Sequence, residues 1–146
     1  MSLLSFVKEA GEKLIDLLTP GNANASEQLK EHISKVGLGN PNVQATVDGD
    51  KVTVKGEVAS QEEKEKILLT LGNIAGIGSV DDQITVTGPV VVAAEFVEVK
   101  AGDTLSAISL RVYGNANQYQ KIFDANKPML KDVNKIYPGQ KLRIPK

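Results

Sequence analysis

The residues best suited to chemistry lie in a glycine-rich segment, Gly72 to Gly78 (GNIAGIG), where three glycines alternate with residues carrying few side-chain oxygens. Such a segment can curl its backbone carbonyls around one point. Carbonyls are neutral dipoles that suit a large, weakly hydrated monovalent cation, whereas Mg²⁺ prefers carboxylates and water. A glycine-rich segment after a helix is also the usual form of a C-cap and turn, and the sequence leaves both interpretations open.

Residue types for acid–base, nucleophilic or metal chemistry are sparse elsewhere. The chain has no cysteine, which excludes disulfides and thiolate metal sites, and its one histidine, His32, lies in an expected helix. Asp81 and Asp82 are neighbours on an expected strand, so they point to opposite faces and cannot share a proton. Asp48-Gly49-Asp50 lacks the remaining ligands of a Ca²⁺ loop, and a hairpin turn explains it. We therefore expect no enzyme.

Charge and hydropathy exclude further classes. The 146 residues include 17 Lys plus Arg and 18 Asp plus Glu, giving a net charge of -1, and there is no Trp, so neither a basic field nor base stacking favours nucleic acid. No stretch approaches the roughly 18 apolar residues of a membrane span. Charged residues interrupt the N-terminal apolar run before a signal peptide is complete. We expect a cytoplasmic protein with no membrane span.

The first element expected is a helix over residues 1–19. Apolar residues follow a 4-3-4-3 spacing, the pattern of one face of an amphipathic helix: Leu3, Val7, Ala10, Leu14 and Leu17. Gly11 would lie inside this helix at a cost of about 1 kcal/mol relative to Ala. Thr19-Pro20-Gly21 would end it.

Residues 26–87 then show the order helix, strand, strand, helix, strand. Leu29, Ile33 and Val36 have helical spacing, alternating valines surround the turn at 48–50, and Ser60 with Glu63 has capping-box spacing. This αββαβ order and the phrase VTVKGEVASQEEKEKILLTLGNIAGIGSVDDQI resemble the BON domain. Residues 88–95 (GPVVVAAE) would form a short extended linker.

Residues 96–145 resemble the LysM domain, for which a βααβ fold is implied. The resemblance rests on an alternating first segment, on GDTLSAIS and IYPGQ, and on a final segment with Leu142 and Ile144. In LysM domains a shallow groove between two loops binds N-acetylglucosamine polymers. The matching positions here are Gly102, Asp103, Thr104, Leu105 and Met129 to Ile136. Asp103 and Thr104 also suit a helix cap, and without an export signal we favour that structural role.

The complete arrangement resembles the small cytoplasmic bacterial potassium-binding proteins of BON-LysM architecture. Matching phrases include FVKEAGEKL, VYGNAN, IFDANKPML and LRIP. The resemblance implies a K⁺ ion held by backbone carbonyls of the N-terminal helix and of the glycine loop. The positions that match are Val7, Lys8, Ala10, Gly72, Ile74 and Ile77. Because the ligands would be main-chain atoms, the residue types predict backbone shape alone; Gly72→Val would weaken binding sharply if Gly72 has positive φ.

The sequence thus predicts an α+β protein with an N-terminal helix, an αββαβ BON domain and a βααβ LysM domain. The function expected is that of a monomeric cytoplasmic K⁺-binding protein that becomes compact on binding, a sensor or buffer in osmotic adaptation. Two alternatives remain: an adaptor that binds peptidoglycan or N-acetylglucosamine oligomers through LysM, and a protein or phospholipid adaptor that acts through BON. Peptidoglycan binding requires export, and the missing signal sequence argues against it.

Overall fold

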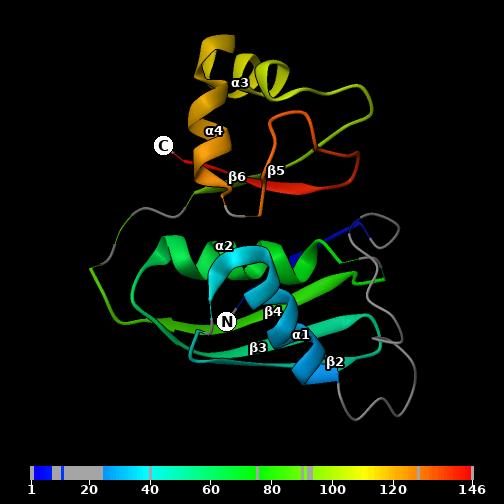
Figure 1. The fold of residues 1–146 in the computed structure, drawn as a ribbon, viewed down its shortest axis with the longest axis vertical. Helices are drawn as coiled ribbons and strands as arrows, with labels where there is room; N and C mark the ends of the chain where they lie inside the picture. The colour runs from blue at the N-terminus through cyan, green and yellow to red at the C-terminus, as the bar shows by residue number, and fades with distance from the viewer. Residues whose placement is uncertain are drawn as a thin grey trace.

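Two β-sheets lie one above the other in the molecule, with a helix of the first unit between them (Figure 1). The computed structural model describes residues 2–7, 11, 25–39, 41–74, 76–89, 91, 94–127 and 129–145. The first sheet has four strands in the order β1-β4-β3-β2, and the second has two, β5 and β6. Among the described residues, no helix has the length and apolar character needed to cross a bilayer.

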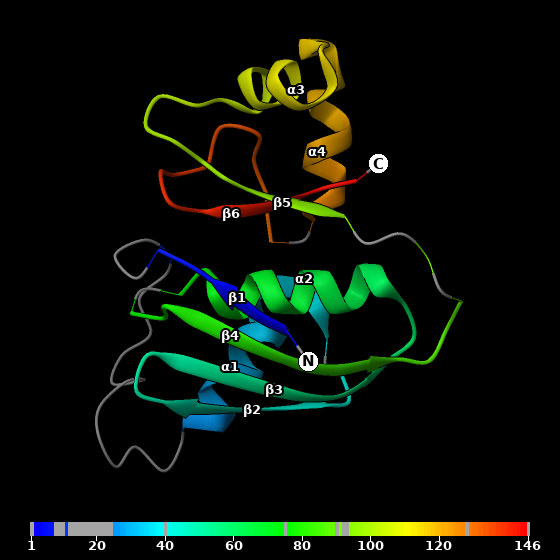
Figure 2. The same ribbon diagram turned by 180° about the vertical axis from the view of Figure 1, so that it is seen from behind.

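The first unit has the predicted αββαβ order. Its elements are α1 (Ala25–Ile33) continued by the π-helical turn η1 (Ser34–Leu38), β2 (Val43–Asp48), β3 (Lys51–Val58), α2 (Gln61–Gly72) and β4 (Ser79–Val86). Strands β2 and β3 form the predicted hairpin, in which Asp48 pairs with Lys51. Strands β3 and β4 are parallel, because α2 carries the chain back between them. Both helices cover the same face of the sheet, as the view from behind shows (Figure 2).

Local signals explain the ends of these helices. The side chain of Ser60 accepts a hydrogen bond from the Glu63 N–H at 3.1 Å, which is the predicted N-cap of α2. Gly37 has φ 116, outside the helical range, so regular helix ends there as expected. The core between helices and sheet is apolar, with Leu29, Ile67 and Leu71 among its fully buried side chains.

The prediction of a helix from residue 1 is wrong where the structure describes the segment. Ser2–Ser5 form strand β1, which pairs antiparallel with β4 in the register Ser5↔Ser79. Pairing with β1 satisfies the backbone hydrogen-bonding groups at the edge of β4. The apolar spacing of the segment fits a strand as well as a helix, so this gain favours the strand. Leu4 and Phe6, two residues apart, pack on the same core. Gly11 has φ 105, which is not helical either. Residues 8–10 and 12–24 lie outside the described residues.

The second unit has the predicted βααβ order. It comprises β5 (Glu95–Glu98), α3 (Leu105–Tyr113), the 3-10 turn η2 (Ala116–Gln118), α4 (Tyr119–Ala125) and β6 (Lys141–Ile144), with β5 antiparallel to β6. Thr104 caps α3 by accepting from the Ala107 N–H at 3.1 Å, and Gly114 (φ 72) ends the helix in the left-handed conformation. A separate apolar core lies between these helices and strands.

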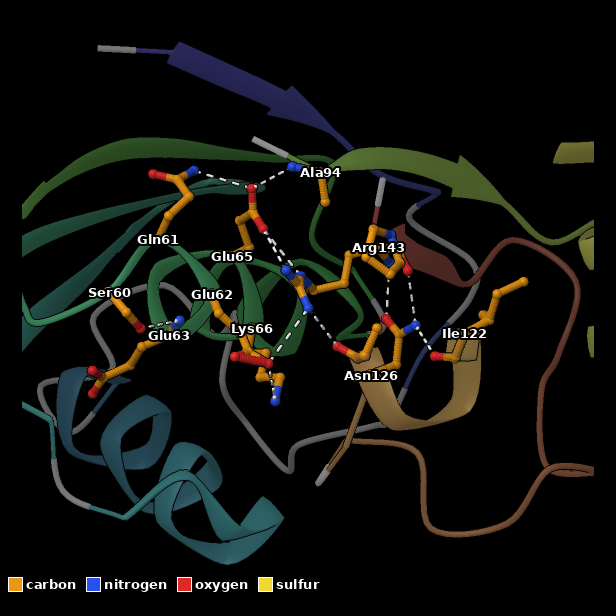
Figure 3. Close-up of polar contacts among 12 residues, drawn as sticks. Ser60, Gln61, Glu62, Glu63, Glu65, Lys66, Ala94, Ile122, Asn126 and Arg143 are labelled. Atoms are coloured by element: carbon orange, nitrogen blue, oxygen red, sulfur yellow. Dashed lines mark hydrogen bonds and ion pairs between the residues drawn. The ribbon is translucent and has the colours of Figure 1, made fainter. Parts of the chain in front are cut away.

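A buried ion pair joins the two units across the face between α2 and β6 (Figure 3). Glu65 of α2 is 2% exposed and Arg143 of β6 is 7% exposed, and the guanidinium Nη2 lies 2.9 Å from Glu65 Oε1. The other carboxylate oxygen accepts from the Ala94 N–H at 2.9 Å, while Arg143 Nη1 donates to the Ala125 carbonyl at 2.9 Å. The pair therefore ties the first unit, the connecting segment and the second unit together.

Candidate cation site

The glycine loop begins where α2 ends and folds into a tight turn. Gly72 is the last residue of α2, and Ile77 donates its N–H to the Ile74 carbonyl at 3.1 Å. Gly76 has φ 96, a conformation that glycine adopts without strain. Ile74 and Ile77 are fully buried, so they anchor the turn in the core.

The N-terminal segment contacts this loop at two described positions. The Phe6 N–H donates to the Gly78 carbonyl at 2.9 Å. Gly11 lies so close to the loop that a Cβ atom there would stand 2.4 Å from the Asn73 carbonyl oxygen. Phe6 and Gly11 lie on either side of residues 7–10 in the sequence, so the two segments expected to supply carbonyls meet at the end of α2.

Gly72 is required for space. A Cβ atom on Gly72 would lie 2.0 Å from Cζ of Phe6, so the ring packs directly on the helix backbone. Gly72 is helical and is not among the glycines with positive φ. The reason considered from the sequence, a left-handed conformation, does not apply to it. The close packing of Phe6 on α2 instead holds the N-terminal segment against the loop.

The C-terminal end of α2 contributes negative potential to this corner. The last carbonyls of a helix lack intrahelical donors, and the C-terminal end carries partial negative charge. The last turn of α2 has no basic residue to compensate this charge. The nearby cation comes from the second unit: Lys141 Nζ donates to the Ser5 carbonyl and lies 4.9 Å above the centre of the Phe6 ring. Burial lowers the pKa of Lys141, and the carboxylate of Glu98 partly opposes that shift.

Asn73 connects the loop with β6. Its side-chain Nδ2 donates to the Lys141 carbonyl at 2.8 Å, and its Oδ1 accepts from the Lys141 N–H at 2.9 Å. Asn73 thus pairs with the backbone of β6 as a neighbouring strand would. These two hydrogen bonds join the glycine loop directly to a strand of the second unit.

Of the six site residues expected from the sequence, the structure describes four. Gly72, Ile74 and Ile77 lie together in the loop, and Val7 follows Phe6, whose N–H is bonded to that loop. Lys8 and Ala10 lie outside the described residues. The coordination of a cation by these six carbonyls remains a prediction.

Sequence reasoning missed two residues that the structure brings to the site. Gly11 was interpreted as an interruption of a helix, although a glycine amid an apolar pattern is also a signal of close backbone approach. Asn73 was seen only as part of the loop. Nothing in the local sequence indicated that its amide would pair with a strand 68 positions away.

The residues that match a LysM sugar groove have structural partners here. Asp103 accepts from the Lys100 N–H at 2.9 Å and lies 3.5 Å from Arg111, while Thr104 caps α3. Gly102 has φ 83 and occupies a turn. On the second loop, Met129 packs against both cores and its sulfur lies 3.6 Å from Asn73 Nδ2. Part of that loop therefore contacts the first unit.

Comparison with known families identifies both units. The BON domain family matches residues 22–88, and the LysM domain family matches residues 97–145. The protein is therefore a BON domain followed by a LysM domain.

The chain is 55% identical, over 149 aligned positions, to the protein named "Potassium binding protein Kbp" from Escherichia coli O6:H1 strain CFT073, and the alignment covers 99% of both chains. It belongs to the family of that protein. An uncharacterized protein of Deinococcus radiodurans is 31% identical over 123 residues, an alignment that covers 74% of this chain and 46% of the relative.

Proposed function

We propose that this protein is a cytoplasmic, non-enzymatic K⁺-binding protein, and that the ion is held by backbone carbonyls of Val7, Lys8, Ala10, Gly72, Ile74 and Ile77. The single observation that carries the proposal is the meeting of two backbone segments at the C-terminal end of α2. The Phe6 N–H donates a hydrogen bond to the Gly78 carbonyl there, and Gly11 contacts the backbone of Asn73. The name of the relative from E. coli, which shares 55% of its residues, supports the same ion.

The chemistry of this corner fits K⁺. Neutral carbonyls replace the loosely held hydration shell of a large monovalent ion, and the partial negative charge at the end of α2 adds attraction. The loop supplies carbonyls from a backbone anchored by two fully buried isoleucines, Ile74 and Ile77. A loop backbone anchored in this way would lose little conformational entropy on binding an ion.

Binding would stabilise the docked arrangement of the two domains. The proposed ligands come from segments far apart in sequence, and a shared ion favours the conformation in which they are together, to the extent of its differential affinity. The Asn73 side chain would extend this stabilisation to the LysM domain through its two hydrogen bonds with the Lys141 backbone. A K⁺ sensor or buffer that acts during osmotic adaptation is the role that such closure would serve.

The LysM domain would contribute architecture in this function. Asp103 and Thr104 are engaged in local hydrogen bonds, and Met129 contacts the BON domain. The alternative of an N-acetylglucosamine-oligomer adaptor is therefore not the one we propose.

Gly11→Ala tests the proposal. An alanine at this position would have to adopt φ 105, and its Cβ would collide with the Asn73 carbonyl. The N-terminal segment and the glycine loop would therefore separate. We expect isothermal titration to show at least a tenfold loss of K⁺ affinity, about 1.4 kcal/mol or more.

Gly114→Ala is the matched control. Gly114 also has positive φ, 72, but a Cβ there would meet nothing within 4 Å. This variant shares the backbone strain and lacks the contact, so its K⁺ affinity should match that of the parent protein. Equal affinity in both variants would show that the ion is bound elsewhere.

A further inference from the structure

A cavity of about 370 Å³ opens between the two domains, on the side of the glycine loop that faces η1. Its walls come from α1 and η1, from the end of α2, and from the segment between α4 and β6. Cavities of roughly 300–1,000 Å³ hold small organic ligands. Both domains contribute side chains, so a ligand here would bridge them.

The charge around this cavity is positive. Lys35 of the BON domain and Lys131 and Lys135 of the LysM domain line it, and no acidic side chain is among its described lining residues. All three lysines are exposed, and none forms an ion pair with the part of the chain that the structure describes. Three ammonium groups around one cavity repel each other and attract an anion.

Gln140 supplies a second, independent indication of a ligand. Its side chain lines the cavity and is 4% exposed, yet its Oε1 atom has no hydrogen-bond partner among the described residues. A buried acceptor without a partner is costly, and such groups in folded proteins are usually satisfied by a ligand or water. This acceptor requires a hydroxyl or N–H donor, which the body of an organic phosphate can supply beside the negative charge that the lysines attract.

We infer that this cavity binds an organic phosphate, whose phosphate group is held by Lys35, Lys131 and Lys135 and whose hydroxyl or N–H group donates to Gln140. The apolar part of the wall, Val36 and Met129, suits the body of such a molecule. A nucleoside monophosphate and a sugar phosphate share this chemistry. The inference is independent of the K⁺ proposal, because no carbonyl of the candidate cation site is used.

Isothermal titration of the full chain at constant K⁺ and constant ionic strength tests the inference. The probes are adenosine 5′-monophosphate, glucose 6-phosphate and inorganic phosphate, with adenosine and glucose as uncharged controls. We expect at least one organic phosphate to bind at or below about 1 mM, at least tenfold more tightly than inorganic phosphate or its uncharged counterpart. Binding of adenosine 5′-monophosphate would identify a nucleoside monophosphate as the ligand class, and binding of glucose 6-phosphate would identify a sugar phosphate.

Three variants locate the site. Lys131→Gln with Lys135→Gln should weaken binding at least tenfold, whereas Lys55→Gln with Lys121→Gln, which makes the same charge change outside the cavity, should not. Gln140→Leu should reduce the preference for organic over inorganic phosphate. The inference is wrong if no organic phosphate saturates the protein, if inorganic phosphate binds equally well, or if both lysine pairs have the same effect.

Discussion

At the scale of single residues, two glycines shape the candidate cation site for different physical reasons. Gly11 has a backbone conformation that other residues rarely adopt, and it abuts the Asn73 carbonyl. Gly72 has ordinary helical geometry and leaves room for the ring of Phe6. Gly11 lets two backbone segments approach each other, and Gly72 lets the Phe6 ring pack on the backbone of α2, so both hold the N-terminal segment close to the glycine loop.

Gly72→Val should weaken K⁺ binding because its Cβ would displace Phe6 and with it the N-terminal segment. We expect a loss of at least about tenfold in affinity by isothermal titration, together with about 1–3 kcal/mol of stability from overpacking. Lys8→Ala is the control, since an ammonium group cannot be a cation ligand, and its affinity should not fall. An unchanged affinity in Gly72→Val would contradict the role of this packing.

The position of the Lys141 ammonium group leads us to expect that K⁺ affinity depends on pH. Its ammonium group is bonded to the Ser5 carbonyl near Val7, and burial lowers its pKa below 10.5, with Glu98 opposing the shift. As pH rises through this lowered pKa, the ammonium becomes neutral and its repulsion of K⁺ disappears. Affinity should therefore increase as the pH rises toward the unperturbed pKa of 10.5.

Lys141→Met and Lys141→Arg separate charge from packing. The Met variant should bind K⁺ about two- to fivefold more tightly at pH 7 and low ionic strength, with no further increase at high pH. The Arg variant stays charged throughout and should show neither effect. A parent protein whose affinity is constant from pH 7 to pH 10 would show that Lys141 does not act on the ion.

At the scale of elements, segments whose apolar residues follow a single clear periodicity could be predicted from the sequence, and the first strand could not. The hairpin β2–β3 followed from alternation around Asp48-Gly49-Asp50, and α2 followed from the Ser60 cap. At Ser2–Ser5 the apolar residues fit both a helix and a strand, and the open edge of β4 decided between them. Because that edge exists only in the folded sheet, local sequence could not reveal it.

The link between α2 and β6 was equally invisible in the sequence. Glu65 and Arg143 are 78 positions apart, and each is charged in a segment that looks like an ordinary amphipathic element. Only the docked domains bury them together. The loop carbonyls of the candidate site remain a prediction from glycine-rich composition and family resemblance, which both indicate backbone shape, whereas the places of Asn73 and Gly11 depend on tertiary contacts.

Arg143→Met should destabilise the docked protein by about 3–5 kcal/mol, because Glu65 would be left as a buried charge without its partner. Adding Glu65→Gln keeps an acceptor for the Ala94 N–H and removes that charge. The double variant should therefore be more stable than Arg143→Met alone, with a coupling of about 1 kcal/mol or more in urea unfolding.

Lys100→Met is the control for this cycle. It breaks the exposed pair of Lys100 with Glu98 and should leave stability nearly unchanged. Strictly additive effects of Arg143→Met and Glu65→Gln would show that the ion pair does not join the domains energetically.

At the scale of the whole molecule, the proposed ion site and the domain junction share α2. Its C-terminal end carries the glycine loop and Asn73, and its middle carries Glu65, so both contacts with β6 start from one helix (Figure 1). Closure of the site and docking of LysM would then be favoured by the same ion. The inferred organic phosphate would act on the same junction through lysines of both domains.

The most direct test of the account is a thermal melt of the full chain titrated with KCl, NaCl and RbCl at matched ionic strength. A ligand that binds only the folded state adds RT ln(1 + [L]/Kd), about 2.7 kcal/mol at a hundredfold excess over Kd. We predict a saturable rise in Tm with K⁺, a similar rise with Rb⁺, and a much smaller one with Na⁺. Equal shifts with K⁺ and Na⁺ would contradict the claim that this protein selectively binds potassium.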